Sequence, residues 1–246
     1  MSRLDRTLLD RGLAASRTLA ARLIRDGCVL VNGAVETKPA RETGEGDEIV
    51  LKDNPLTRYV SRGGLKLEKA LDAFGVDPAG LVCVDVGAST GGFTDCLLQR
   101  GAAKVYAVDS GTDQLHPSLR GDKRVVSLEN VNARYLDGDL FPAADLAVMD
   151  VSFISQAKIY PALARILKKD GRAITLIKPQ FEVGKEKIAS GGIVRDEKAK
   201  KDCIEALKDA ARESGFTMAG VIPSPILGGD GNEEFLALFL GKEYKA

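Results

Sequence analysis

LVCVDVGASTGGFTDCLLQR, residues 81–100, is the stretch that decides the fold. Its apolar start predicts a buried strand, the glycines that follow predict a tight turn, and Phe93 and Leu97 recur at helical spacing. A strand, a glycine-rich turn and a helix in this order bring backbone amides close to a ligand at the helix N-terminus. A second predicted strand, 104–108, ends at Asp109, where a carboxylate can bind ribose hydroxyls. The stretch therefore predicts a nucleotide-type binding site.

The glycine-rich turn reads Asp85-Val-Gly-Ala-Ser-Thr-Gly-Gly92. The dinucleotide fingerprint Gly-x-Gly-x-x-Gly fits it poorly, because a carboxylate precedes the first glycine and Ser89 occupies the middle position. The turn resembles instead the Asp-x-Gly-x-Gly-x-Gly loop of S-adenosylmethionine-dependent methyltransferases. This resemblance implies that Asp85 lies near the amino group of the cofactor. It also implies that the methionine and ribose of the cofactor lie against the backbone of Gly87, Ser89, Gly91 and Gly92. Another nucleotide, or a turn that binds no ligand, is an alternative.

The composition is that of an ordinary globular protein. Of the 246 residues, 44% are hydrophobic and 28% charged, and the length suits one large and one small domain. The formal net charge is zero, so no global field favours nucleic acid or a membrane. Neither a leader nor an apolar run near the ~18 residues of a membrane span is present, so we expect a cytoplasmic protein without membrane contact or an obligate protein partner. The widely spaced cysteines predict free thiols and no metal site; they are Cys28, Cys83, Cys96 and Cys203.

The first 25 residues carry six arginines against two aspartates. Apolar residues at helical spacing predict two helices, 3–12 and 17–26, that leave these arginines on their outer faces. A hairpin is expected at 29–37, centred on an Asn-Gly turn, and a further strand at 46–51. Two explanations of these arginines are equally open: they form a helical surface in contact with water, or they bind nucleic acid.

Three short signatures in this region go together: Ser16-Arg17, Val31-Asn-Gly33 and Gly46-Asp-Glu-Ile49. They resemble the S4 RNA-binding domain, which implies that two helices and a hairpin present basic residues to structured RNA. The planar guanidinium group can bind phosphate with two hydrogen bonds at once. Such contacts position RNA without reading its sequence. The candidates for them are Arg3, Arg6, Arg17 and Arg22.

Asp53-Asn-Pro55 breaks the last strand of this region and predicts a domain boundary. We expect a small α+β RNA-binding domain at 1–53, a linker at 54–62 and a second domain at 63–246. In the second domain strands alternate with helices, which favours an α/β fold with a doubly wound, mostly parallel sheet of seven strands. The last two strands are joined without a helix, so we expect an antiparallel edge.

Charged residues stand at the ends of four predicted strands: Asp85, Asp109, Asp150 and Lys178. One charged residue in such a place is explained by its contact with water. Open α/β sheets bind their ligands at the carboxyl ends of the strands. Four charged residues at this edge, beside a glycine-rich loop, therefore predict a functional site.

Five motifs follow one another along the chain: Ser61-Arg-Gly-Gly-Leu-Lys66, Asp85-Val-Gly-Ala-Ser-Thr-Gly-Gly-Phe-Thr-Asp95, Met149-Asp-Val-Ser-Phe-Ile-Ser155, Ile177-Lys-Pro-Gln-Phe-Glu182 and Gly231-Asn-Glu-Glu-Phe235. They resemble the FtsJ-like ribose 2′-O-methyltransferases. With the S4-like region, the whole chain resembles the TlyA group, also labelled hemolysin A. The resemblance implies a Rossmann-like, S-adenosylmethionine-dependent domain. It also implies methyl transfer to a ribose 2′-hydroxyl, of cytidine, in ribosomal RNA of the small or large subunit or both.

FtsJ-like enzymes carry a Lys-Asp-Lys-Glu tetrad, which the resemblance assigns to Lys66, Asp150, Lys178 and Glu234. A ribose hydroxyl must lose its proton as it attacks the sulfonium methyl group. Lys178 is the candidate base, because a neighbouring ammonium group and partial burial favour an uncharged amine. The two carboxylates would orient the lysines. Glu233 is a rival for Glu234, and Lys69 for Lys66. Surface lysines in structural ion pairs are the alternative explanation.

The resemblance implies further cofactor contacts. Asp109 would hold the ribose hydroxyls, and Asn130 or Asn132, with Asp150, would lie near the adenine or methionine. Phe93 would shape the pocket unless it packs in the core. Other functions stay open: a ribosome- or RNA-binding protein without turnover, a membrane-active hemolysin, and a base methyltransferase. A base methyltransferase needs an aromatic pocket for a flipped base, which a chain without tryptophan disfavours.

Overall fold

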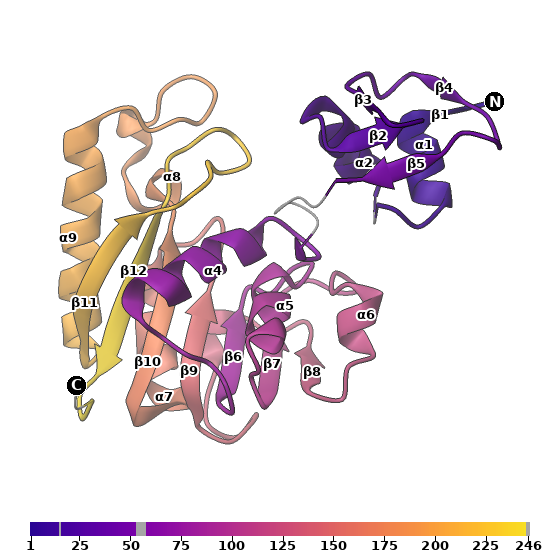
Figure 1. The fold of residues 1–246 in the computed structure, drawn as a ribbon. Helices are drawn as coiled ribbons and strands as arrows, with labels where there is room; N and C mark the ends of the chain where they lie inside the picture. Colours follow the sequence, from indigo (N-terminus) through magenta and orange to yellow (C-terminus); the bar gives the residue numbers. More distant parts are fainter. Residues whose placement is uncertain (15, 53–57, 245–246) are drawn as a thin grey trace. The chain divides into compact units, whose positions relative to one another are not determined.

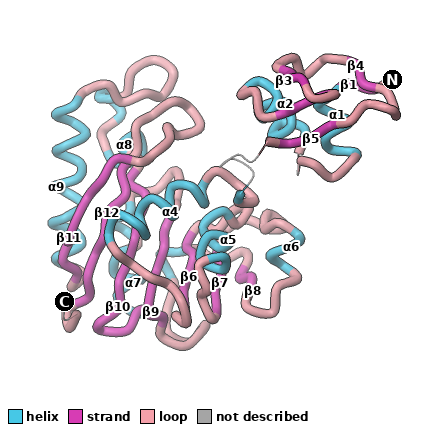
Figure 2. The backbone as a smooth tube through the Cα atoms, viewed as in Figure 1, coloured by secondary structure: helices cyan, strands magenta, loops and turns pink. Residues whose placement is uncertain are grey.

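The fold is known from a computed structural model that describes all residues except 15, 53–57 and 245–246. The chain divides into two compact units, Met1–Val60 and Ser61–Ala246 (Figures 1 and 2). Each unit has a hydrophobic core of its own. Residues 54–57 of the expected linker at 54–62 lie outside the described residues, and its last two residues belong to the second unit.

In its described residues, the N-terminal unit combines two helices with two small sheets. Its elements are β1 (Ser2–Arg3), α1 (Leu4–Asp10), α2 (Arg17–Arg25), β2 (Val29–Val31), β3 (Ala34–Glu36), β4 (Glu42–Thr43) and β5 (Ile49–Leu51). β1 pairs with β4, and β2 lies between β3 and β5 in an antiparallel sheet. The Ser16 hydroxyl caps α2 by accepting the Leu19 amide at 3.2 Å. Asn32 and Gly33 have the positive φ angles that the expected hairpin turn requires.

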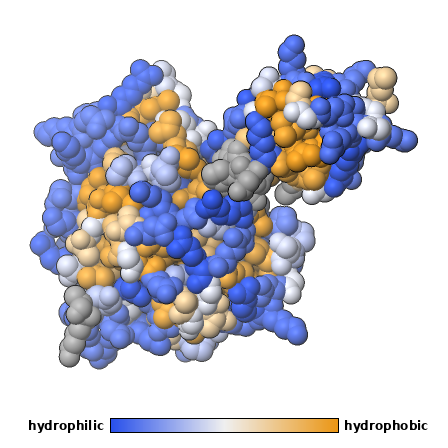
Figure 3. Space-filling model, viewed as in Figure 1, coloured by the Kyte–Doolittle hydropathy of each residue, from blue (hydrophilic) through white to orange (hydrophobic). Residues whose placement is uncertain are grey.

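Alternating side chains in this sheet separate an inner from an outer face. Val29 and Val31 are buried against the helices. Leu30 points the other way and is flanked in register by Val35 and Val50, which are 51% and 43% exposed. Figure 3 shows apolar residues gathered on the viewed face of this unit. One face of the sheet therefore builds the core and the other reaches the surface.

The C-terminal unit is built on a seven-stranded sheet in the order β11-β12-β10-β9-β6-β7-β8. The strands are β6 (Val82–Val86), β7 (Lys104–Val108), β8 (Val125–Leu128), β9 (Ala144–Met149), β10 (Leu167–Ile177), β11 (Phe216–Pro223) and β12 (Phe235–Gly241). β12 runs antiparallel to β10 and β11, and the remaining pairs are parallel. The predicted Rossmann-like sheet with an antiparallel pair near one edge is therefore confirmed.

Helices cover both faces of this sheet. They are α4 (Gly63–Phe74), α5 (Gly92–Gln99), α6 (Pro117–Arg120), α7 (Tyr160–Ile166), α8 (Pro179–Glu182) and α9 (Glu197–Glu213), with short 3-10 turns η1 (Ala133–Tyr135), η2 (Gln156–Lys158) and η3 (Lys185–Lys187). Figure 1 shows α4 and α5 in front of the sheet and α7 behind it. Leu163 of α7 and Leu207 of α9 share one core cluster with the strands. These two helices therefore cover the same face.

The sheet order places the candidate residues at one edge. β10, β9, β6 and β7 are parallel neighbours, so their carboxyl ends lie side by side. Asp109, Asp150 and Lys178 directly follow β7, β9 and β10, and the glycine-rich loop follows β6. Among the described residues, no helix has the length and apolarity needed to cross a membrane.

Candidate active site

Two adjoining cavities open at this edge of the sheet. The smaller has a volume of about 280 Å³ and is lined by Lys66, Lys178 and the glycine-rich loop. The larger, of about 520 Å³, is lined by Asp109, Asn132 and the segment 150–154. The two cavities share part of their lining: Gly87, Ser89, Asp150 and Ser152. A third cavity of about 510 Å³ lies at the opposite end of β10 and β11 and has none of the candidate residues in its lining.

The glycine-rich loop passes very close to the chain that follows β9. Gly87 has φ +83°, and a side chain there would overlap the backbone carbonyl oxygen of Asp150. Ser89 has φ +47°, so the serine takes the left-handed conformation expected of the glycine that it replaces. The loop therefore keeps the backbone course of a glycine-rich loop in spite of its serine.

Replacing Gly87 with alanine is expected to weaken binding of the expected cofactor, S-adenosylmethionine, by at least about 10-fold. The left-handed backbone would cost a residue with a side chain about 1–3 kcal/mol, and the loop would have to move away from Asp150. Calorimetric titration with the cofactor measures the effect. Ser89→Gly is the matched control, because φ +47° suits glycine, and its affinity should stay within about twofold of wild type. Equal affinity of Gly87→Ala and wild type would contradict this account of the loop.

The carboxylate of Asp109 is fixed at the wall of the larger cavity. Its Oδ2 accepts the Ser89 amide at 2.7 Å, and its Oδ1 accepts the Gly111 amide at 2.8 Å. Asn132 also lines this cavity, but its side chain accepts the Arg134 amide at 3.1 Å. Asn130 is outside the described lining of both cavities. Of the two expected asparagines, the structure thus brings Asn132 to the cavity.

Asp85 lies behind the loop rather than in either cavity. It is fully buried, and its Oδ2 accepts the Thr94 amide at 2.9 Å and the Thr94 hydroxyl at 2.7 Å. Its Oδ1 has no hydrogen-bond partner among the described residues. Burial is the main cause that raises the pKa of Asp85, to about 7, and the Asp150 charge adds to it. Asp85 therefore joins the end of β6 to the first turn of α5.

The other loop residues divide between the cavity and the core. Gly92 and Phe93 line the smaller cavity, although Phe93 is only 4% exposed. Gly91 packs against Leu115 and Leu119, with φ +95°, and is outside the described lining of both cavities. Two of the expected contacts, Asp85 and Gly91, thus support the loop from behind.

A network of polar contacts holds Lys178 at the smaller cavity. Its Nζ lies 2.6 Å from Oδ1 of Asp150 and donates to the Ser152 hydroxyl at 2.9 Å. The Lys178 side chain is 13% exposed and that of Asp150 24%. The amine is therefore oriented by two groups and still reaches the cavity.

A second lysine–carboxylate pair lies beside the first. Lys66 of α4 lines the smaller cavity and forms a buried ion pair with Glu234, which directly precedes β12. The residues are 8% and 4% exposed. Glu233 turns away and pairs with Lys200 of α9. The structure thus brings Lys66, Asp150 and Lys178 to the smaller cavity, with Glu234 paired to Lys66, and Lys69 is outside the described lining of this cavity.

Several polar lining residues were not among those singled out from sequence, and Ser152, Ser61, Arg62 and Gln114 are four of them. Ser152 touches both cavities and binds Lys178, while Ser61 and Arg62 line the smaller cavity and Gln114 the larger. The first three belong to motifs that already carried a candidate lysine or aspartate, so those motifs could have pointed to them. Gln114 lies outside every motif, and no sequence signal marks it.

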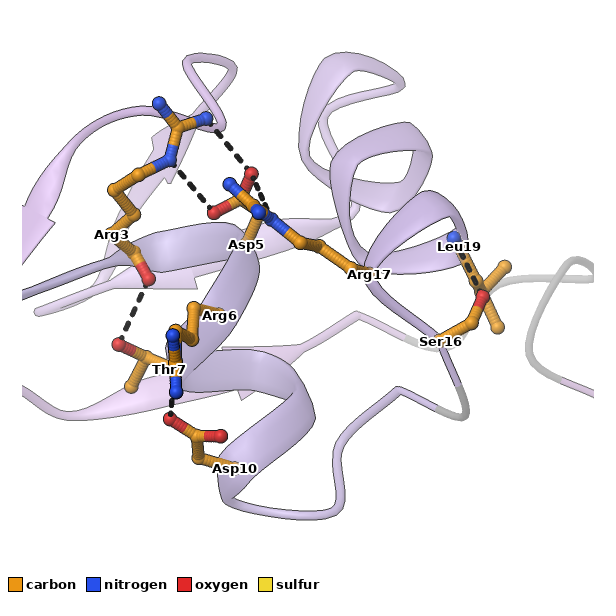
Figure 4. A network of polar contacts seen from close by, with 8 residues as sticks. All are labelled: Arg3, Asp5, Arg6, Thr7, Asp10, Ser16, Arg17 and Leu19. Atoms are coloured by element: carbon orange, nitrogen blue, oxygen red, sulfur yellow. Dashed lines mark hydrogen bonds and ion pairs between the residues drawn. The ribbon is translucent and has the colours of Figure 1, made fainter.

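The four candidate arginines of the N-terminal unit all face carboxylates. Arg3 binds Asp5 with two hydrogen bonds of 2.9 and 3.1 Å, and Arg17 binds the same carboxylate at 3.2 Å (Figure 4). Arg6 lies 3.7 Å from Asp10, and Arg22 lies 3.5 Å from Asp26. The four arginine side chains are 40% to 69% exposed. Their guanidinium groups are thus oriented by carboxylates and still accessible.

Asp5 is the buried centre of this network, and its replacement should change stability in a pH-dependent way. The hydrogen bond from Arg3, helped by Arg17, lowers the pKa of Asp5 from 3.8 to about 2. Because the pKa is lower in the folded protein than in the unfolded chain, the ionised carboxylate stabilises the fold at pH values above about 4. This stabilisation is lost as the pH falls from about 4 to about 2. Asp5→Asn should therefore cost up to about 2 kcal/mol at pH 7 and almost nothing near pH 2. Urea unfolding at both pH values measures the difference, and an equal cost at both would refute the assignment.

The parallel sheet, the glycine-rich loop and the adjoining cavities define a methyltransferase-type α/β domain preceded by a small α+β domain. The comparisons name both parts: the FtsJ-like methyltransferase family matches residues 59–240, and the S4 domain matches residues 2–49. The chain belongs to the FtsJ-like methyltransferase family and carries an S4 domain at its N-terminus. The family resemblance expected from sequence is therefore confirmed.

Relatives along almost the whole chain support this assignment. The chain is 44% identical over 235 residues to "16S/23S rRNA (cytidine-2'-O)-methyltransferase TlyA" of Mycobacterium tuberculosis, covering 95% of this chain and 88% of the relative. It is 42% identical to "Hemolysin A" of Brachyspira hyodysenteriae, covering 97% and 99%. A solved structure from Streptococcus thermophilus, named as a presumed hemolysin, has a TM-score of 0.79 at 45% identity, covering 99% of this chain and 89% of that one.

A more distant solved structure shares the fold alone. It is an S-adenosylmethionine-dependent methyltransferase from Mesorhizobium loti, with a TM-score of 0.52 at 16% identity, and the match covers 70% of this chain and 96% of that one.

Proposed function

We propose that this protein transfers the methyl group of S-adenosylmethionine to the 2′-hydroxyl of a cytidine ribose in ribosomal RNA. The observation that carries the proposal is the pair of lysine–carboxylate contacts at the smaller cavity, Lys178 with Asp150 and Lys66 with Glu234. The TlyA relative, named for this reaction, supports the choice of cytidine and of ribosomal RNA.

The larger cavity suits the cofactor in size and chemistry. Its volume of about 520 Å³ lies in the range of small-molecule sites. Each carboxylate oxygen of Asp109 accepts one backbone amide and has a further lone pair free, which would accept a hydrogen bond from a ribose hydroxyl. Gly87 and Ser89 would give the methionine part backbone contacts, and Asn132 would lie near the adenine. When bound, the cofactor supplies an electrophilic methyl group on its sulfonium.

The residues of the smaller cavity would orient the ribose 2′-hydroxyl and remove its proton. Lys178, whose Nζ Asp150 and Ser152 already orient, would first release a proton to water and then, as the uncharged amine, take the proton of the 2′-hydroxyl. Lys66, held by Glu234, would place a second donor beside the ribose. Asp150 belongs to the lining of both cavities, so the two reacting groups would meet next to it.

The S4 domain would bind the RNA. Arg3, Arg6, Arg17 and Arg22 offer exposed guanidinium groups that fit phosphate oxygens. In this proposal residues 1–53 form the RNA-binding part and residues 63–246 the catalytic part.

Transfer of radiolabelled methyl groups tests the proposal. Purified protein would be incubated with labelled S-adenosylmethionine and with isolated small subunits, isolated large subunits or protein-free ribosomal RNA. Label in RNA supports a methyltransferase and shows which form of the substrate is used. Cofactor binding without transfer to any of them would instead support an RNA-binding protein that does not turn over.

A further inference from the structure

The chain segments that follow β9 and β10 contact each other at several points. At one end, Lys178 meets Asp150 and Ser152. In the middle, the rings of Phe153 and Phe181 pack with their centroids 5.0 Å apart. These contacts join the segment 150–156 to α8, the short helix that begins one residue after Lys178.

The far end of this contact is a polar anchor at Glu182, the half-buried last residue of α8. Its Oε1 accepts a hydrogen bond from the Gln156 amide at 2.9 Å. Gln156 is 2% exposed, donates through Nε2 to the Leu176 carbonyl at 2.6 Å and accepts the Tyr160 hydroxyl at 3.1 Å. Glu182 therefore ties α8 to a residue that is itself fixed to β10 and α7.

The segment between the two ends is strained. Phe153 has φ +64°, which an aromatic residue adopts at a cost of about 1–3 kcal/mol, and the residue is 91% exposed. Such a conformation persists only where contacts on both sides hold it. On one side these are the contacts of Lys178, and on the other the Glu182 anchor.

We propose that Glu182 is a positioning residue for Lys178, which holds the segment 150–156 against α8 and so sets the place of Asp150 and Ser152 around the amine. The inference rests on the proposed function, because it concerns the efficiency of methyl transfer. Loss of the anchor would let the strained segment relax and move both partners of Lys178. Glu182 is outside the described lining of both cavities, so its effect would pass through Lys178.

Steady-state kinetics of Glu182→Ala and Glu182→Gln test the proposal, with Glu186→Ala as a control at an exposed glutamate of η3. Glu182→Ala should lower kcat about 10- to 100-fold, the usual cost of a small misplacement, and leave KM for S-adenosylmethionine within about twofold. Glu182→Gln keeps an oxygen that can accept the Gln156 amide, so kcat should recover to within about threefold of wild type. Thermal unfolding shows that each variant is folded at the assay temperature.

Three results would overturn the inference: a wild-type kcat in Glu182→Ala, a Glu182→Gln variant as slow as Glu182→Ala, or a rise in cofactor KM with unchanged kcat. In each of these cases the wild-type protein still transfers methyl groups, so the result does not contradict the proposed function. Wild-type protein that transfers no label to any RNA would overturn the proposed function and this inference together.

Discussion

Replacing Lys178 with alanine is expected to lower methyl transfer by about 10²- to 10⁴-fold, the range for loss of a general base. Lys178 lines the smaller cavity and is outside the described lining of the larger one, so the affinity for S-adenosylmethionine should stay within a few-fold of wild type. Single-turnover transfer to RNA measures the first effect, and calorimetric titration measures the second. The loss should therefore lie in the chemical step.

Lys185→Ala is the matched control for this experiment. Lys185 is an exposed lysine of the neighbouring turn η3, and removing it changes the total charge equally. Its transfer rate should remain close to that of wild type. Equal rates in Lys178→Ala and wild type would remove Lys178 from the mechanism, and equal losses in both variants would point to charge alone.

Replacing Glu234 with alanine should affect stability as well as activity. It leaves the buried ammonium group of Lys66 without its carboxylate, which typically costs about 3–5 kcal/mol of unfolding free energy. Methyl transfer should fall by about 10²-fold or more, because Lys66 would leave its place at the cavity to reach water. Urea unfolding and single-turnover transfer measure the two effects, with the assays run where the variant is folded.

The neighbouring glutamate offers a control within the same motif. Glu233 is 56% exposed and shares Lys200 with Glu197, so Glu233→Ala should cost about 1 kcal/mol or less. It should leave methyl transfer near the wild-type rate. A larger loss in Glu233→Ala than in Glu234→Ala would exchange the roles of the two residues.

Local sequence patterns predicted the main features of the C-terminal domain. The apolar run before Gly87 predicted β6, and the helical spacing of apolar residues after the turn predicted α5. The alternation of strands and helices predicted the parallel sheet. Parallel order then places the ends of neighbouring strands together, so Asp109, Asp150 and Lys178 could be expected at one edge.

Contacts between residues that are distant in the sequence could not be predicted from local patterns. The strand β1 has only two residues and pairs with β4, about forty positions away, so no periodicity marks it. The sequence shows a carboxylate at Asp85 but not that it would bind Thr94 behind the loop. The strand register after Gly231-Asn232 favours Glu234 over Glu233, but it does not show that their partners are Lys66 of α4 and Lys200 of α9. In each case tertiary packing decides what local propensity leaves open.

The chemical identity of the labelled nucleoside tests the central claim most directly. RNA labelled by the wild-type protein would be digested to nucleosides and separated, alongside RNA treated with Lys178→Ala. We expect label in 2′-O-methylcytidine and almost none in the sample from the variant. Label on a base, or equal 2′-O-methylation by Lys178→Ala, would contradict the assignment of the two lysine–carboxylate pairs to a ribose hydroxyl.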